Sequence, residues 1–475
     1  MKGTREAGIL LAVSSLPSPY GIGNFGKDAY KWIDFLAQSG QTYWQILPLG
    51  PTGWGDSPYQ TFSCFAISPY SIDIDALVKD NLLTQDEAKD ESAAFVHCKS
   101  KCDYGLLYQR RNKLLRSAYL RFVTNTTQTV LYQQFCTEHA FWLTDYTAFM
   151  SQKAKSGHDE FFQFEQFIAF TQWQKLKSYA GSKGIKIIGD MPIYPSPDSA
   201  DVFFHPDLFQ LDASKKPTAV AGCPPDAFTS EGQVWGNPLY RWDVLKEQHF
   251  DWWLKRLDTS LQLFDVLRID HFRGFESYFS IPAGDASAVN GHWEEGPGMA
   301  FINAVHTQFG KEAPIIAEDL GYLTPQVHAL LDASGFPGMK LLQFAFDSRE
   351  SSNSAYFPYN YPKNTIAYTG THDNIPSAAW AKNASPADVE LAVHYFGISG
   401  TDDLCSVFVN ALMGSVSDTA IIPLQDWLGL GAEARMNTPS IASGNWQWRL
   451  SPDMLDKALS DRIRTVTKIT GRKQC

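Results

Sequence analysis

The chain has 475 residues, of which 44% are hydrophobic, and it carries a formal net charge of −11 at pH 7. This much apolar material is enough for one large domain with insertions or for two to three ordinary domains, and it excludes a disordered chain. An acidic chain without any Lys/Arg-rich run lacks the positive charge that nucleic-acid binding requires, so we expect no nucleic-acid partner.

The N-terminal region and the cysteines indicate where the protein resides. The first apolar stretch, Ile9 to Val13, is too short for a secretion signal, and no later segment reaches membrane-spanning length. Seven cysteines form an odd, scattered set in a chain that needs no disulfides. We therefore expect a cytoplasmic protein without a membrane partner.

One short segment comes close to the spacing of zinc ligands. His97, Cys98 and Cys102 lie within a few positions of one another. No second pair completes a set of four ligands, so surface or core thiols are the preferred interpretation. The sequence therefore predicts no metal site.

Eight short apolar runs predict strands, because they are too brief or too rich in β-branched residues for helices. Nearly every run ends in polar or catalytic residue types. In chain order the runs are Ile9–Leu16, Thr42–Leu49, Ile185–Ile193, Phe264–Phe272, Ala313–Leu320, Gly338–Asp347, Thr365–Asp373 and Thr419–Trp427.

Helical patterns fall between these runs. Residues 27–38 form an amphipathic pattern, Thr324 with Pro325 opens another, and Leu455 to Val466 close the chain with a third. Alternation of helices with fully apolar strands implies a parallel sheet. Eight such units predict an α/β fold of the (β/α)8 TIM-barrel type, whose active site lies at the C-terminal ends of the strands.

Two gaps between the runs, 51–184 and 194–263, are too long for one helix and its loops and predict insertions around the barrel mouth. The first has helical patterns at 84–91, 104–123 and 130–154, so we expect a mainly helical subdomain. The second is expected to be loop-rich and helical. We interpret residues 1–475 as one catalytic barrel domain without a C-terminal β-sandwich, because the last pattern is helical.

Carboxylates follow three of the predicted strands. Arg268 and Asp270 share one face of the fourth strand, so we expect the cation to lower the pKa of Asp270 and keep it ionised, as a nucleophile requires. Glu318 and Asp319 end the fifth run, and Asp373 ends the seventh. Cleavage of a glycosidic bond needs one acid for the leaving oxygen and one carboxylate at the anomeric carbon. Each carboxylate taken alone is equally compatible with a strand-end salt bridge or a helix cap.

The aromatic residues are numerous, with 14 Trp, 20 Tyr and 31 Phe. Many stand beside Gly, Pro and Asp in expected loops, where flat apolar rings next to polar groups suit the faces of sugars. Most of the Phe residues are nevertheless expected in the core.

Several strings resemble the conserved segments of the amylomaltases, the disproportionating 4-α-glucanotransferases of glycoside hydrolase family 77, related to the α-amylase superfamily. They are RIDHFRG, IIAEDLG, GTHDN and GDMPIY, together with SSLPSPYGIGNFG, WQILPLGPTGWGDSPYQ, CPPDAFTSEGQVWGNPLY, GFPGMKLLQFAFD, ARMNTP and NWQWR. The resemblance spans nearly the whole chain. It implies retaining transfer of an α-1,4-glucan segment to the 4-hydroxyl of another glucan, with no cofactor and no metal.

The resemblance also implies partners and roles. The expected substrates are maltotriose, longer maltodextrins, and amylose or glycogen-derived chains, with glucose as an acceptor. Asp270 is the implied nucleophile, Glu318 the general acid and then base, and Asp373 the transition-state stabiliser. Arg268 would orient Asp270. The further substrate-binding residues that it implies are Trp54, Ser57, Tyr59, Asp190, Phe228, Gln233, Trp235, Asn237, His372 and Asn445.

Some of these assignments have alternatives. Asp190 could equally be a structural strand-end acid, and Trp446 and Trp448 could stack on sugars or be buried against the barrel floor. Residues 223–237 resemble a loop that covers the active site, with Ala227 where an aromatic is expected. Phe203 stands where a Trp is more usual.

Two other functions remain open. An α-amylase-type hydrolase of α-1,4-glucans is disfavoured because no all-β signature follows Trp427. A catalytically silent glucan-binding barrel would be favoured if one of the three carboxylates were missing, and none is.

Overall fold

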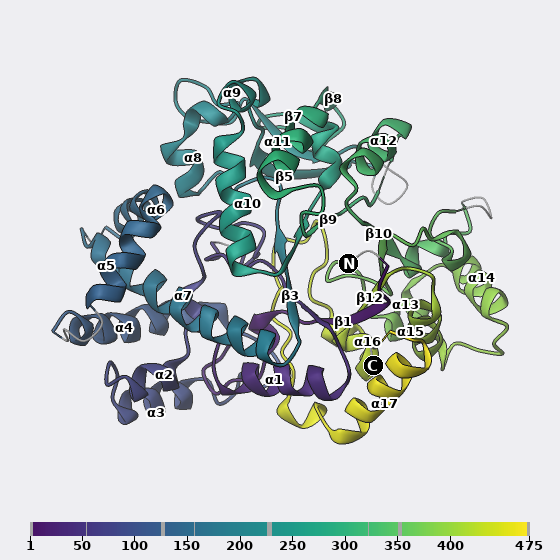
Figure 1. Ribbon diagram of the computed structural model, residues 1–475, viewed down its shortest axis with the longest axis horizontal. Coiled ribbons are helices and arrows are strands. Elements are labelled where there is room, and N and C mark those ends of the chain that lie inside the picture. The colour runs from purple at the N-terminus through teal and green to yellow at the C-terminus, as the bar shows by residue number, and fades with distance from the viewer. Residues whose placement is uncertain are drawn as a thin grey trace.

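A closed barrel of eight parallel strands forms the centre of the molecule (Figure 1). The computed structural model describes residues 3–53, 55–124, 129–155, 157–225, 230–321, 323–349 and 354–472. The strands are β1 Glu6–Leu10, β2 Tyr43–Gln45, β3 Lys186–Met191, β6 Val266–Ile269, β9 Ile315–Ala317, β10 Gly338–Leu341, β11 Thr365–Tyr368 and β12 Thr419–Pro423.

The strand order is β10-β11-β12-β1-β2-β3-β6-β9. Between the two end strands, the Ala317 N–H donates to the Pro337 carbonyl at 3.0 Å, which closes the ring. The predicted (β/α)8 barrel is therefore confirmed. Seven of the predicted runs contain one strand each, whereas β1 begins at Glu6 and shares only Ile9 and Leu10 with the first predicted run, Ile9–Leu16. The strands end before most of the polar residues, so these residues lie in the loops at the barrel mouth.

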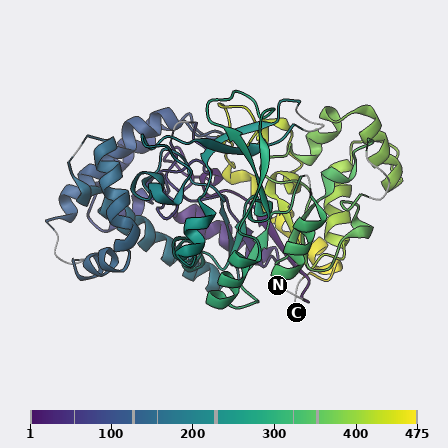
Figure 2. The same ribbon diagram turned by 90° about the horizontal axis from the view of Figure 1, so that it is seen from above.

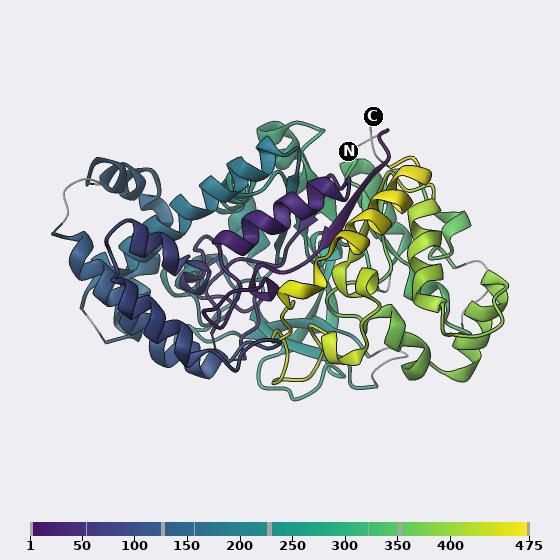
Figure 3. The same ribbon diagram turned by 90° about the horizontal axis from the view of Figure 1, so that it is seen from below.

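Helix α1, Lys27–Gln38, and helix α17, Lys457–Ile469, both occupy the predicted positions and lie side by side on the outside of the barrel (Figure 3). The Ser39 hydroxyl donates to Ser460 at 3.1 Å, and the Gln41 amide donates to Thr467 at 2.9 Å. These bonds join the first and last helices of the fold. Helix α12, Pro325–Ser334, begins as predicted at Thr324, whose side chain accepts from the Val327 N–H.

The first insertion, 51–184, folds mainly into helices at one end of the molecule (Figure 2). They are α2 Ile74–Lys79, α3 Gln85–Ala94, α4 Tyr104–Phe122, α5 Thr129–Glu138, α6 Ala140–Lys153 and α7 Asp159–Ser182. The pattern at 130–154 forms two helices instead of one. The chain turns at His139, and Phe135 and Trp142 on either side of the turn both pack against Phe170 of α7.

A second, antiparallel sheet lies beside the barrel in the order β5-β4-β7-β8. Its strands are β4 Ala219–Cys223, β5 Gln233–Pro238, β7 Ser277–Pro282 and β8 His292–Glu295. The insertion 194–263 thus contains two strands in addition to α8 Ala200–Phe204, α9 Trp242–Glu247 and α10 Asp251–Leu263, whereas the sequence indicated loops and helices. Because β7 begins a few residues after Asp270, this sheet borders the barrel mouth.

The remaining helices complete the outer layer. They are α11 Met299–Phe309, α13 Ser377–Asn383, α14 Pro386–Phe396, α15 Leu404–Gly414 and α16 Leu424–Leu428. Helices α13 to α15 form the end of the molecule opposite the first insertion (Figures 1 and 2). From Leu424 to Arg472 the described chain forms no further strand. None of the described helices combines the length and the apolar character needed to cross a membrane.

Candidate active site

Arg268 holds two carboxylates at the end of strand β6. Residues Asp190 on β3 and Arg268 on β6 are register partners. The Nη1 atom of Arg268 lies 2.7 and 2.8 Å from the two oxygens of Asp190, and Nη2 lies 2.9 Å from Oδ1 of Asp270. Asp190 is fully enclosed, whereas the side chain of Asp270 is 30% exposed. The arrangement fixes Asp270 and leaves part of its carboxylate open to a ligand.

The pKa of Asp270 differs from the sequence-based expectation. Enclosure by the protein raises this pKa to about 6, with Asp190 and Asp373 adding to the rise and Arg268 opposing it. Arg268 acts in the predicted direction, because its charge lowers the pKa of Asp270, but burial outweighs this effect and the net pKa is raised. Arg268 thereby limits the rise, so that Asp270 remains ionised at neutral pH.

Glu318, which follows β9, lies next to the chain at Asp270. Its Oε2 accepts the His271 N–H at 2.6 Å and its Oε1 accepts the Leu320 N–H at 3.0 Å. His271 has a left-handed backbone (φ 53°), which turns the chain sharply after Asp270. Burial raises the pKa of Glu318 to about 8, and the negative charge of Asp270 adds to this rise. At neutral pH the site thus pairs an ionised Asp270 with a protonated Glu318, as an acid and a nucleophile require.

Asp319 differs from its neighbour Glu318 in its surroundings. It is 2% exposed, its Oδ1 accepts the Met339 N–H at 2.5 Å, and Lys340 lies 3.9 Å from Oδ2. A Cβ atom added at Gly338 would come within 2.7 Å of the Asp319 carboxylate. Asp319 therefore ties β9 to β10 and does not face the mouth.

Asp373 follows β11 and is the most exposed of the three predicted catalytic carboxylates. Its side chain is 44% exposed. Asn437 donates to Oδ1 at 2.6 Å, His372 Nε2 lies 3.4 Å from the same oxygen, and Arg435 donates to the backbone carbonyl at 2.8 Å. Sequence reasoning missed Arg435 and Asn437 as site residues, although both stand in the string ARMNTP.

Three rings form a wall beside the carboxylates. Tyr59 stacks on His372 with ring centroids 5.1 Å apart, and Trp446 packs against both rings at 5.7 and 5.8 Å. The Tyr59 hydroxyl donates to Asp190 at 2.8 Å. Trp446 and Trp448 are only 5% and 6% exposed, which favours burial over stacking on a sugar for both.

Two further predicted substrate-binding residues, Gln233 and Trp235, lie close to the candidate active site. Gln233 and Trp235 lie on β5, where the Trp235 N–H donates to the Gln233 side chain at 3.0 Å and the Trp235 ring packs edge-on to His271. Both are half-buried beside the chain that follows Asp270.

The remaining predicted substrate-binding residues that the structure describes form hydrogen bonds within the protein. Asn237 donates to the Pro195 carbonyl and accepts from Gln60, both at 2.8 Å. Asn445 bonds to Thr438 and Ile441 and thereby closes its own loop. The Ser57 hydroxyl accepts the Tyr59 N–H at 3.3 Å. Trp54, Ala227 and Phe228 lie outside the described residues.

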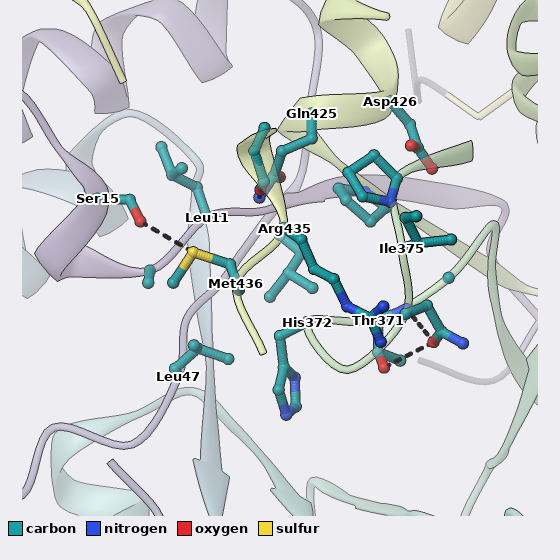
Figure 4. A pocket seen from close by; sticks show the side chains of 17 residues that line it. Leu11, Ser15, Leu47, Thr371, His372, Ile375, Gln425, Asp426, Arg435 and Met436 are labelled. Atoms are coloured by element: carbon teal, nitrogen blue, oxygen red, sulfur yellow. Dashed lines mark hydrogen bonds between the residues drawn. The ribbon is translucent and has the colours of Figure 1, made fainter. Parts of the chain in front are cut away.

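A small cavity adjoins His372 (Figure 4). Arg435 and Thr371 lie on one side of it and Met436 and Leu11 on the other, and the imidazole of His372 points away from Asp426. Asp426 accepts from Thr369 and twice from Ser377, so its carboxylate is fully used inside the protein. None of the three predicted catalytic carboxylates lines this cavity.

Among the described residues, one group of side chains could hold a metal ion, and it lies outside this site. His97, Cys98 and Asp103 have ligand atoms within 4.8 Å of one another. None of the carboxylates at the barrel mouth belongs to the group.

The chain matches known proteins over nearly all of its length. The family model described as 4-alpha-glucanotransferase (glycoside hydrolase family 77) matches residues 11–161 and 152–455. A 4-alpha-glucanotransferase of Clostridium butyricum is 43% identical, with 97% of this chain and 99% of that protein covered. One of Thermus thermophilus is 42% identical, with 99% and 100% covered. The amylomaltase of Streptococcus agalactiae, solved in complex with acarbose, superposes with a TM-score of 0.95 at 37% identity, covering 99% of this chain and 100% of that one.

Proposed function

The chain belongs to the 4-alpha-glucanotransferase family, and we propose from this that Asp270, Glu318 and Asp373 perform the transfer at its barrel mouth. The protein acts on α-glucans and transfers an α-1,4-linked segment from one glucan chain to another. The finer proposals below concern the role of each residue and the identity of donor and acceptor.

Asp270 attacks the anomeric carbon of the bound donor and forms a glycosyl-enzyme intermediate. The proposal is supported by the ion pair with Arg268 and by the partial exposure of the carboxylate. Because the Asp270 pKa is raised only to about 6, the group is ionised when the enzyme works near neutral pH.

Glu318 donates its proton to the glycosidic oxygen that leaves, and then accepts the proton of the acceptor 4-hydroxyl. Its raised pKa keeps the proton in place until the bond breaks. Two displacements at one carbon retain the configuration of the new bond. The observation that carries this proposal is the bond from the His271 N–H to Glu318, which sets the acid next to the nucleophile.

Asp373 accepts hydrogen bonds from sugar hydroxyls in the transition state, and Asn437 and Arg435 hold it in position. Tyr59, His372 and Trp235 border the donor ring. Asp190 acts through Arg268 and does not itself touch the sugar. Maltotriose and longer maltodextrins are the proposed donors, and glucose and shorter maltodextrins the proposed acceptors.

A cytoplasmic location is also proposed. Cys64, Cys98, Cys102, Cys136 and Cys405 carry free thiols, as is usual in a reducing compartment.

One experiment tests the proposed donor and acceptor. Purified protein is incubated with maltotriose alone while the product ladder and the total reducing ends are followed together. Glucose plus longer maltodextrins at constant reducing ends is the expected result. Rising reducing ends without longer products would instead indicate hydrolysis, and the absence of any change would contradict maltotriose as a donor.

A further inference from the structure

The segment between helices α3 and α4 brings together three side chains that can bind a metal ion. In the sequence, His97 and Cys98 come close to the spacing of zinc ligands, and the structure adds Asp103. His97 and Cys98 are adjacent in the chain, and Asp103 is the N-cap residue of α4. One ligand atom from each lies within 4.8 Å of the others. We propose that His97, Cys98 and Asp103 form a binding site for a zinc-class divalent cation.

The geometry of Asp103 leaves one carboxylate oxygen for a cation. Oδ1 accepts the Leu106 N–H at 2.9 Å and so caps the helix, while Oδ2 faces His97 Nε2 at 3.8 Å. A tetrahedral zinc site places its ligand atoms roughly 3.5 Å apart, given its bond lengths. The His97 side chain is 60% exposed and can rotate to close the remaining gap without disturbing the core.

The ligand types favour zinc over magnesium or calcium. A thiolate and an imidazole are soft or borderline donors, which Mg²⁺ and Ca²⁺ bind poorly. One thiolate and one carboxylate neutralise the two charges of the ion, and three protein ligands leave a fourth position for water. Binding breaks the S–H bond of the buried Cys98, forms an S–metal bond and releases one proton to solvent.

Arg449 is the neighbouring positive charge that opposes a cation. Its guanidinium is directed at backbone carbonyls, with Nη1 donating to Cys98 and Nη2 to Ser18. The same charge stabilises the Cys98 thiolate. Arg449 therefore weakens the attraction for the ion and favours the ionised state of its ligand.

The position of this segment gives the site a structural role. Cys102 N–H donates to the Gln447 carbonyl at 2.7 Å, and Arg449 N–H donates to the Ser100 carbonyl at 2.8 Å. Tyr104 donates to the carbonyl of Trp446 at 3.0 Å. A bound ion would thus hold in shape the loop 97–103, whose neighbouring groups bond to the segment that carries Trp446, and Trp446 packs on Tyr59 and His372 in the catalytic site.

Metal titration of the full-length protein tests the site. Chelator-treated protein is titrated with Co²⁺ and then with Zn²⁺ as competitor. One equivalent of Co²⁺ is expected to bind with a thiolate-to-cobalt charge-transfer band that Zn²⁺ abolishes. Cys98→Ser should lose the band, and His97→Gln should weaken binding by at least about tenfold. Cys136→Ser, a change of the same type on helix α5, is the matched control and should behave as wild type.

Three outcomes would overturn the proposal. They are a wild type that binds no Co²⁺, a charge-transfer band that persists in Cys98→Ser, or a loss of the band to the same extent in Cys98→Ser and Cys136→Ser. If Cys98→Ser fails to fold, His97→Gln decides, because His97 is exposed and its change leaves the core intact.

The structural role has its own readout. Zn²⁺ should raise the unfolding temperature of wild type and leave that of His97→Gln unchanged, because only a ligand of the folded state stabilises it. Binding without any rise in the unfolding temperature would refute a stabilising role for the ion.

Discussion

The guanidinium of Arg268 lies 2.9 Å from the carboxylate of Asp270 while it also forms two hydrogen bonds to Asp190. One buried cation thus serves two carboxylates, of which only Asp270 is exposed at the barrel mouth. This relationship explains why Asp270 can stay ionised in a site that otherwise favours the neutral acid. It also makes the properties of Asp270 depend on a residue that does not react.

Arg268→Lys should reduce kcat by at least about tenfold and move the acid limb of the pH profile to higher pH. The planar guanidinium of Arg268 pairs with both Asp190 and Asp270, and a lysine ammonium cannot do so in the same geometry. Asp270 therefore loses its ion pair and its pKa rises. The measurement is kcat/KM against pH with maltotriose. Arg256→Lys is the control, because Arg256 is equally buried but donates to the backbone carbonyls of Pro192 and Ile193. An unshifted acid limb in Arg268→Lys would contradict the proposed electrostatic role.

The wild-type enzyme should show a bell-shaped dependence of kcat/KM on pH. Activity should fall below about pH 6, where Asp270 becomes protonated, and above about pH 8, where Glu318 loses its proton. Glu318→Gln should lose most activity on maltotriose and much less on a glycosyl fluoride, whose leaving group needs no protonation. An alkaline limb that persists in Glu318→Gln with the fluoride donor would refute Glu318 as the acid.

Asp270→Asn should lower kcat by several orders of magnitude without unfolding the protein, because the amide cannot attack the anomeric carbon. The steady-state rate on maltotriose and the circular dichroism spectrum are measured together. Near-wild-type turnover would remove Asp270 from the proposed mechanism.

Asn437→Ala should lower kcat by about tenfold or more with a smaller effect on KM, because Asp373 loses the 2.6 Å hydrogen bond that orients it. Asn445→Ala is the matched control, because the Asn445 side chain hydrogen-bonds to Thr438 and Ile441 within the same loop, whereas Asn437 hydrogen-bonds to Asp373. If both variants lose activity equally, the effect comes from loosening the loop and not from the position of Asp373.

Asp319→Asn should reduce stability by about 1–3 kcal/mol while the folded fraction keeps most of its activity. The change weakens the bond to the Met339 N–H and the ion pair with Lys340, both away from the mouth. Urea denaturation and the specific activity of the folded protein are the measurements. A loss of kcat as large as that of Glu318→Gln would mean that Asp319 takes part in catalysis.

Glu165→Gln should stabilise the protein at alkaline pH. Glu165 on helix α7 is 3% exposed, and burial raises its pKa from 4.5 to about 8. The folded protein therefore binds this proton more tightly than the unfolded chain, so the Glu165 contribution is fully present below pH 4.5 and is lost as the pH rises towards 8. Unfolding temperatures of both proteins at pH 5 and pH 9 test this, and an equal difference at the two pH values would contradict it.

The barrel and its three carboxylates could be predicted because both depend on residues that are close together in the sequence. Each strand is a short apolar run, and nearly every run is followed by polar residues, some of which are exposed at the mouth and some of which are buried in ion pairs or hydrogen bonds. The antiparallel sheet was not predicted, since Gly222 of β4 pairs with Phe279 of β7, far away in the sequence. The break at His139 was missed because its helical pattern continues on both sides.

The sequence by itself determined the fold class, the positions of the strands and the identity of the candidate carboxylates. Only the tertiary structure determined the partners and the pKa values of these carboxylates. Glu318 and Asp319 are neighbours with the same functional group, yet one lies beside Asp270 and the other between β9 and β10. The pKa of Asp270 and the partnership of Asp373 with Asn437 likewise depend on groups that only the closed barrel brings together. Electrostatic interactions act over distances in space, and separation along the chain does not report those distances.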